Sequence, residues 1–231
     1  MATSHKGPSL NQCKYVMDLL KEADLLDCKL ASTLLDCKWK VSMEGEPLHN
    51  VSYYQRLVGK LVYLTITRPD ITFVVNLVSQ FMHAPTTDHL HVAKRILRYL
   101  KGSIGHGIFM QNHNSTKILG FTNADWAGNT LDRKSTISYC TFVGDNLVTW
   151  KSKKQPVIAH SNAESKYRAM ASTDCELIWI KSLRQNLGFS YYTPMSLTRD
   201  NQAAMYIAYN LVFHEQTKHI EADCHYIRAQ V

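Results

Sequence analysis

Hydrophobic residues recur with a helical period through roughly the first hundred positions of the chain. This spacing predicts helices over residues 11–26, from residue 51 onward, from Pro69 onward and over residues 86–102. Residues 27–50 lack such a period and are predicted to form an exposed connector. The positions expected to face the core of these helices are Tyr15, Leu19, Leu20, Ala23, Leu26, Ile71, Val74, Val75, Val78, Phe81, Leu90, Ala93, Ile96, Leu97 and Leu100.

From about residue 104 the pattern changes to short apolar runs separated by turn residues, which is typical of strands. The predicted elements, in chain order, are strands at 107–110 and 117–123, a hairpin at 135–155 turning at Gly144-Asp145-Asn146, a helix at 163–187, a strand at 195–200 and helices at 201–210 and 217–230. The fold class is therefore α/β. A mainly helical segment over residues 1–103 is followed, over residues 104–231, by a mixed sheet with flanking helices.

Composition narrows the range of partners. Lys and Arg outnumber Asp and Glu by 26 to 19, which gives a formal net charge of +7 and favours polyanions such as nucleic acid. The six cysteines form no C-x-x-C pair, so reduced thiols and a cytoplasmic or nuclear location are expected. The amino-terminal residues do not resemble a secretory signal, and the longest apolar stretch, residues 71–82, is interrupted by polar side chains, so no membrane insertion is expected.

Two groups of basic side chains are candidates for contact with phosphate. The first lies on the polar side of the helix over residues 86–102, and the second follows Trp150 in the hairpin. The candidate nucleic-acid-binding residues are Lys94, Arg95, Arg98, Lys151, Lys153 and Lys154. The alternative for both groups is an ordinary solvated surface. A cluster of His214, His219, Cys224 and His225 fits no standard zinc spacing, and zinc binding is not expected there.

Several strings of the sequence together resemble a known family. They are "YQRLVGKLVYLTITRPDITFVVNLVSQFM", "RILRYLKG", "DRKST", "SKKQP", "AESKYRAM", "DNQAA" and "TKHIEADCHYIR". In this order they resemble the Pol polyprotein of copia-type retrotransposons, from about residue 7 to residue 231. The resemblance implies a reverse transcriptase thumb and connection remnant followed by a ribonuclease H-like domain. It also implies other Pol segments and RNA–DNA hybrid as partners, and Mg²⁺ as the cofactor for hydrolysis of the RNA strand.

Two of the acidic residues that the resemblance implies are replaced by other residue types in this chain. The family has Asp, a metal ligand, where this chain has Asn123, and Glu, a second ligand, where this chain has Lys166, whereas Asp200 is retained. The fourth acid belongs to a family segment that follows the last matched strings, together with the last strand and helix, so the domain is expected to be truncated. Repulsion between a divalent ion and Lys166 at about 4 Å amounts to roughly 8 kcal/mol at an effective dielectric of about 20. Hydrolysis is therefore predicted to be lost.

The neighbouring acids Asp125 and Glu164 are not expected to replace the acids that the resemblance implies at positions 123 and 166. Asp125 shares a strand face with Asn123 but lies about 6–7 Å further along, too far for an unshifted ion. Glu164 is expected to point away from Lys166 on the helix. Two alternatives stay open: an active Mg²⁺-dependent hybrid nuclease that uses Asp125 and Asp200, and a fold recruited by a host as a binding module.

Overall fold

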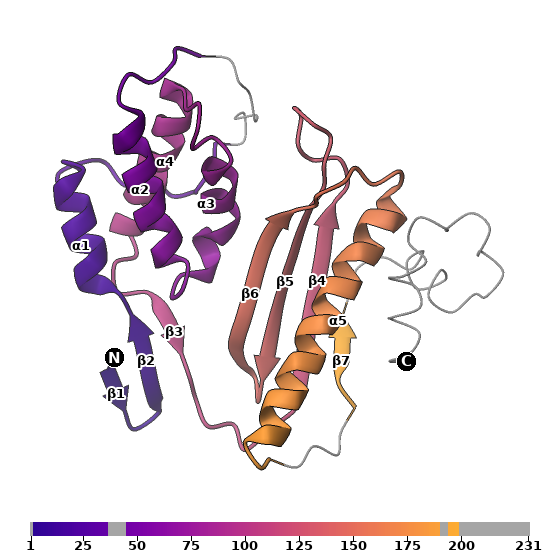
Figure 1. Cartoon of the computed structure of the whole chain (residues 1–231). Helices are drawn as coiled ribbons and strands as arrows, with labels where there is room; N and C mark the ends of the chain where they lie inside the picture. The colour runs from indigo at the N-terminus through magenta and orange to yellow at the C-terminus, as the bar shows by residue number, and fades with distance from the viewer. Residues whose placement is uncertain (1, 37–44, 190–193, 199–231) are drawn as a thin grey trace. The chain divides into compact units, whose positions relative to one another are not determined.

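The computed structural model describes residues 2–36, 45–189 and 194–198, and it has the expected α/β class. The chain divides into two compact units, Met1–Gln111 and Asn112–Val231 (Figure 1). The first unit has a three-stranded sheet and several helices, and the described part of the second unit has a four-stranded sheet and the helix α5. None of the helices in the described ranges is both long and apolar enough to cross a membrane.

The helices of the first unit match the predicted ones. They are α1 (Cys13–Glu22), α2 (Val51–Leu64), the short 3₁₀ helix η1 (Pro69–Ile71), α3 (Thr72–Ser79) and α4 (Thr87–Lys101). Local chemistry sets where they begin. The Asn50 side chain accepts a hydrogen bond from the Tyr53 N–H at 2.9 Å, Pro69 occupies the first turn of η1, and Thr86 forms a capping box with His89.

One continuous core joins these helices. Most of the positions predicted to face inward are buried in it, including Leu20, Ile71 and Leu97. Tyr15, Ala23 and Leu90 are half-buried against this core. Leu26 is 40% exposed, because α1 ends at Glu22 and Leu26 lies beyond it. The connector is irregular over residues 27–36 and 45–50, as predicted.

A small sheet in the first unit was not predicted. It is three-stranded and antiparallel, with β1 (Ala2–Ser4), β2 (Gly7–Asn11) and β3 (Gly107–Phe109) in that order. The predicted strand at 107–110 was expected to start the second sheet, and this expectation is wrong because β3 pairs with β2. The close pairing requires Gly107, since a Cβ atom there would lie 2.2 Å from the Leu10 carbonyl oxygen.

The second unit contains a four-stranded sheet in the order β6-β5-β4-β7. Its strands are β4 (Ile118–Asp125), β5 (Thr136–Val143), β6 (Asn146–Lys154) and β7 (Ser196–Thr198). The first three pair antiparallel, and β7 runs parallel to β4. The β5–β6 hairpin turns at Gly144 and Asp145, both with positive φ, as the turn residues predicted.

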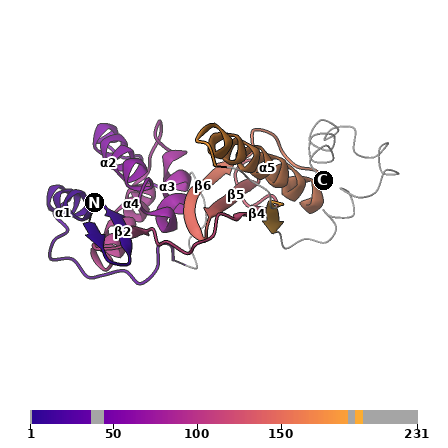
Figure 2. The same ribbon diagram turned by 90° about the horizontal axis from the view of Figure 1, so that it is seen from below.

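The helix α5 (Asn162–Asn186) covers one face of this sheet (Figures 1 and 2). The Thr173 hydroxyl donates to the Thr122 hydroxyl at 2.9 Å, and a Cβ atom on Gly120 would lie 3.1 Å from the Leu177 side chain. The predicted inward positions of this helix are all buried: Tyr167, Met170, Ala171, Leu177 and Ile180. The predicted helices at 201–210 and 217–230, the position Asp200 and the histidine–cysteine cluster lie outside the described residues.

Candidate functional site

The end of β4 presents two different faces. Thr122 and Ala124 are buried on the face that α5 covers, whereas Asn123 and Asp125 are exposed on the opposite face. This alternation follows from the two-residue repeat of a strand. The sequence therefore placed Asn123 and Asp125 correctly on a shared face.

The Asn123 side chain is used locally. Its amide oxygen accepts a hydrogen bond from the backbone N–H of Ala124 at 2.8 Å. An amide oxygen that already accepts this bond is a weaker metal ligand than a free carboxylate, and it carries no charge with which to attract a cation.

Asp125 serves the backbone of the following loop. Its carboxylate accepts a hydrogen bond from the backbone N–H of Thr136, and a Cβ atom on Gly128 would lie 2.1 Å from its Oδ2 atom. Burial raises the pKa of Asp125 above its ordinary value, although the Thr136 N–H acts in the opposite direction. Asp125, which the sequence analysis considered as a substitute for Asn123, thus holds the β4–β5 loop closed.

Lys166 lies near the start of α5 on the stripe that faces the sheet. It precedes Met170 and Thr173 by one and two helical turns, and both of these residues are buried. Thr173 contacts Thr122. Lys166 lies about 10 Å from Thr173 toward the start of α5, and Asp125 lies about 10 Å from Thr122 toward the end of β4, so the two are at a similar level. Lys166 and Asn123 therefore lie toward the same end of β4, with Lys166 on the covered face and Asn123 on the opposite one.

Glu164 is committed to the start of the same helix. Its side chain is 2% exposed, accepts a hydrogen bond from the His160 N–H at 2.7 Å, and pairs with Arg168 at 2.7 Å. These contacts tie the Glu164 side chain to the start of α5. Within the described ranges, no group of three or more His, Cys, Asp or Glu side chains is placed to hold a metal ion.

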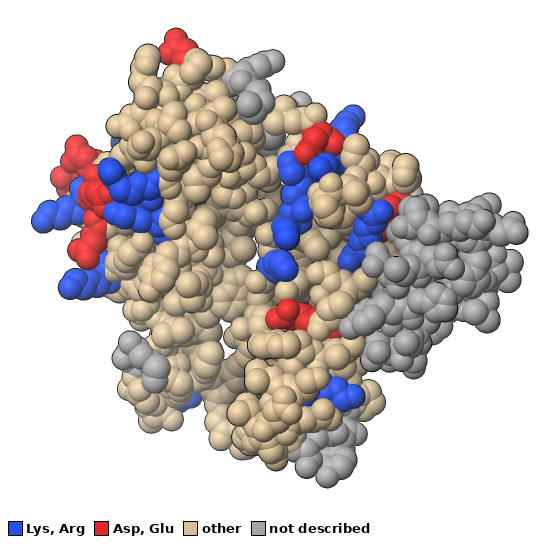
Figure 3. Space-filling model, in the orientation of Figure 1, with Lys and Arg blue, Asp and Glu red and all other residues tan. Residues whose placement is uncertain are grey.

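The basic residues of the β5–β6 hairpin differ in how free they are to contact phosphate. Lys151 and Lys153 are exposed, and their pairing with Tyr139 and Ile137 places them on the face of the sheet that carries α5. Lys154 instead forms an ion pair with Asp132 at 2.8 Å. Figure 3 shows Lys and Arg side chains gathered toward the β6 side of this unit. Because Lys154 is paired with Asp132, the positive charges of Lys151 and Lys153 are the more accessible ones in this hairpin.

The basic side of α4 is largely engaged with the connector. Arg95 donates to the carbonyl and hydroxyl oxygens of Thr33 at 3.1 and 2.9 Å, and Lys101 donates to the Cys28 carbonyl at 2.7 Å. The Arg98 backbone carbonyl accepts from Ala31 at 3.3 Å. Lys94, the remaining candidate on this helix, is half-buried. These contacts attach residues 28–33 to α4, a role that the sequence analysis did not predict.

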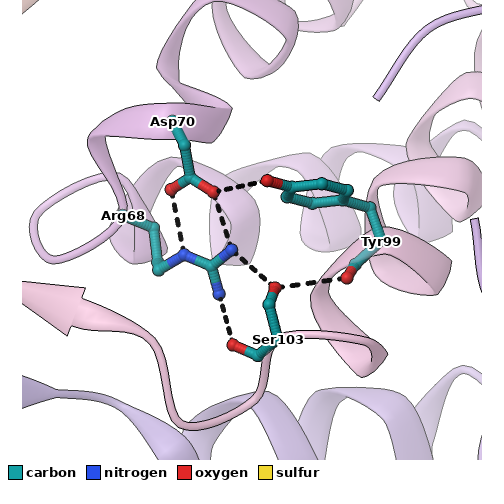
Figure 4. Close-up of polar contacts among 4 residues, drawn as sticks. All are labelled: Arg68, Asp70, Tyr99 and Ser103. Carbon is teal, nitrogen blue, oxygen red and sulfur yellow. Dashed lines mark hydrogen bonds and ion pairs between the residues drawn. The ribbon is translucent and has the colours of Figure 1, made fainter. Parts of the chain in front are cut away.

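A buried arginine network was also missed (Figure 4). Arg68, 2% exposed, donates two hydrogen bonds to Asp70 and two to the carbonyl and hydroxyl oxygens of Ser103, while Tyr99 donates to Asp70 at 3.1 Å. Burial opposes ionisation of Asp70, but the hydrogen bonds and charge of Arg68 outweigh it and lower the pKa of Asp70. The network joins the segment after α2 to the end of α4.

Comparison with known proteins identifies the family. The retrovirus-related Pol polyprotein from transposon RE1 of Arabidopsis thaliana is 42% identical over 97% of this chain, and the one from transposon TNT 1-94 of Nicotiana tabacum is 34% identical over 96%. The uncharacterized mitochondrial protein AtMg00810 of Arabidopsis thaliana is 42% identical over 79% of this chain and 76% of its own length. The chain belongs to the Pol polyproteins of copia-type retrotransposons.

The match covers a small part of each full-length Pol protein. The chain spans 15% of the length of the RE1 polyprotein and 17% of the TNT 1-94 polyprotein. No model of a protein family matches the chain, and no solved structure matches it. The family assignment therefore rests on these curated relatives, and the activity of this Pol segment is argued from its own residues.

Proposed function

We propose that this Pol segment is a nucleic-acid-binding piece whose second unit is a ribonuclease H-like domain without cleavage activity. In this proposal the first unit is a remnant of the reverse transcriptase thumb and connection. Membership in the Pol family supports it, as does the order of three antiparallel strands, a helix and a parallel strand in the second unit. The substrate would be an RNA–DNA hybrid, held weakly and without sequence preference.

The observation that carries the proposal is the chemistry at the end of β4. Asn123 is neutral and Lys166 is cationic where the family resemblance implies acids, and the nearby acid Asp125 is bonded to the backbone of Thr136. Mg²⁺ is a hard cation that takes oxygen ligands, usually including carboxylates. These side chains do not fit a pair of Mg²⁺ ions, and no catalytic step is assigned to such ions here.

Binding would fall to the exposed lysines of β6. Lys151 and Lys153 lie two residues apart on one face of a strand, about 7 Å from each other. That distance is close to the spacing of successive phosphates along one strand of a nucleic acid. Because lysine contacts the backbone as a point charge, the expected binding is independent of sequence and weakens as salt displaces the contacts.

A labelled RNA–DNA hybrid tests both parts of the proposal. With Mg²⁺ or Mn²⁺ present, we expect salt-dependent binding in a mobility or anisotropy assay and no shortening of the RNA strand. Turnover that Asp200→Asn abolishes would refute the loss of cleavage. Absence of binding at low salt would refute the nucleic-acid role, whatever the cleavage result.

A further inference from the structure

Trp126 directly follows β4 and keeps much of its ring at the surface. Its indole N–H donates a hydrogen bond to the Ala159 carbonyl oxygen at 3.1 Å, and α5 begins three residues later at Asn162. The side chain is nevertheless 52% exposed. One polar contact therefore fixes an edge of the indole, while a large apolar surface of the ring stays in water. A fixed, exposed indole is suited to stack on a flat ligand group, because little side-chain freedom is lost on contact.

We propose that Trp126 is a stacking platform for an unpaired nucleobase, next to the phosphates that Lys151 and Lys153 contact. This inference rests on the proposed function and adds a substrate class to it: nucleic acid that carries a single-stranded nucleotide beside the hybrid. Every nucleobase has a flat π-face, so this contact would be independent of sequence, as the lysine contacts are. Inside a duplex the face is covered by neighbouring base pairs, so only an unstacked base can reach the ring.

The pairing of the sheet places Trp126 and the two lysines on the same side. Ala124, Ile137 and Lys153 are direct cross-strand neighbours and share the face that α5 covers. The bond from Trp126 to Ala159, just before α5, keeps the indole toward that face. Neighbouring strands are about 4.8 Å apart, and Trp126 lies two residues past Ala124, so it is roughly 10–15 Å from Lys153. A nucleic-acid strand that contacts both lysines therefore reaches the ring within a few nucleotides.

The charge of this part of the chain favours a polyanion. Residues 125–168 contain seven Lys and Arg residues and four Asp and Glu residues. Three of the acids, Asp125, Asp132 and Glu164, already accept a hydrogen bond or form an ion pair. The fourth, Asp145, lies in the hairpin turn at the opposite end of β6 from Lys153. The surroundings of Trp126 are therefore positive, which attracts nucleic acid.

A protein partner is a poorer occupant. Val157 and Ile158, each 50% exposed, directly precede Ala159 and lie next to Trp126 in an exposed apolar group. A standard protein interface buries about 800 Å² on each partner. A whole aromatic side chain offers at most about 250 Å², so these three half-exposed residues provide less than half of that area. An apolar group of this size suits one or two nucleotides.

The first test measures the affinity of the full, unsubstituted chain for three RNA–DNA hybrids at low salt by fluorescence anisotropy. One hybrid is blunt, one carries a short single-stranded overhang, and one carries an overhang of the same length made of abasic nucleotides. The two overhangs have the same phosphates, so only the bases distinguish them. We expect the overhang with bases to bind about tenfold more tightly than the abasic one.

The possible results separate this inference from the proposed function. Equal affinity for the two overhangs would leave the exposed ring to a protein partner and would overturn the inference, while hybrid binding through the lysines would stand. Failure of all three hybrids to bind would refute the proposed function, and this inference with it.

Substitutions at Trp126 separate stacking from a structural role. Trp126→Phe and Trp126→Leu both lose the hydrogen bond to Ala159, but only Trp126→Phe keeps an aromatic face. The preference for the overhang with bases should persist in Trp126→Phe and disappear in Trp126→Leu. Trp179→Leu, at a position 55% exposed on α5, is the control and should leave the preference unchanged. Equal loss of the preference in both Trp126 variants would assign the effect to the bond with Ala159 and overturn the inference.

A further measurement needs no substitution and decides the question if Trp126→Leu fails to fold. A fluorescent adenine analogue, placed as the only base of an otherwise abasic overhang, loses fluorescence when it stacks on an indole. We expect its fluorescence to fall as the unsubstituted chain binds the hybrid. Unquenched fluorescence in the saturated complex would overturn the inference.

Discussion

The carboxylate of Asp125 accepts a hydrogen bond from the backbone N–H of Thr136, and this bond closes the loop between β4 and β5. A Cβ atom on Gly128 would lie 2.1 Å from Oδ2 of the same carboxylate, so a side chain at this position would force Asp125 to move. The observed role of Asp125 is therefore to accept a hydrogen bond from the backbone. Its position at the end of β4 does not by itself make it a metal ligand.

Replacing Asp125 should affect stability. Asp125→Ala removes the acceptor and leaves the Thr136 N–H unpaired, so we expect the free energy of unfolding to fall by about 1–3 kcal/mol in urea denaturation. Asp125→Asn keeps an acceptor oxygen and should lose clearly less. If Asp125 were a ligand, both variants would also lose Mn²⁺ affinity in a calorimetric titration, Asp125→Ala more than Asp125→Asn.

Restoring the family's acids should restore part of the ion binding. The two positions lie on opposite faces of the sheet but toward the same end of β4, so the two carboxylates would have to reach around that end to share one ion. The double substitution Asn123→Asp with Lys166→Glu changes the charge there by three units in the negative direction, and Mn²⁺ and Mg²⁺ affinity should rise at least tenfold if they do. Full hydrolysis of the hybrid is not expected. Asn123→Asp alone should have a smaller effect because Lys166 remains. An unchanged ion affinity in the double variant would show that these two positions do not share a site.

The Arg68 network should make a large contribution to the stability of the first unit. Arg68→Met leaves Asp70 without its cation and the Ser103 carbonyl without a donor, so we expect a loss of roughly 3 kcal/mol. Arg56→Met, which breaks an exposed ion pair with Glu22, is the control and should cost less than about 1 kcal/mol. Similar losses in the two variants would contradict the importance of burial.

The same network predicts a dependence on acid. The pKa of Asp70 is lower in the folded chain than in the unfolded chain, so the folded state favours the ionised carboxylate. This stabilisation is fully present above about pH 4, the ordinary value for Asp, and is lost as the pH falls through the lower folded value. Urea midpoints measured between pH 6 and pH 3 should therefore fall less in Asp70→Asn than in the unsubstituted chain.

Basic residues on the two units should separate into binding and structural classes. Lys151→Gln with Lys153→Gln should weaken hybrid binding several-fold and lower the slope of affinity against salt by about two phosphate contacts. Lys154→Gln should have less effect on binding, because Lys154 is paired with Asp132. Arg95→Gln should lower thermal stability, because it releases Thr33. Equal loss of binding in Arg95→Gln and the double lysine variant would place nucleic acid on α4 as well.

The sequence by itself determined most of the described helices and the strands of the second sheet, but not β1 and β2. Period and turn chemistry placed α2, α4, the hairpin and α5 within a few residues, because these signals are local properties of the chain. The strand repeat also placed Asn123 and Asp125 on one face.

Tertiary structure decided which partners these residues meet. The pairing of β3 with β2, the contact of Arg95 with Thr33 and the enclosure of Arg68 by Ser103 all join residues that are far apart in the chain. No periodic pattern encodes such pairs. Whether a polar side chain serves the fold or a ligand depends on the unpaired backbone groups that folding brings beside it, as the bond from Thr136 to Asp125 illustrates.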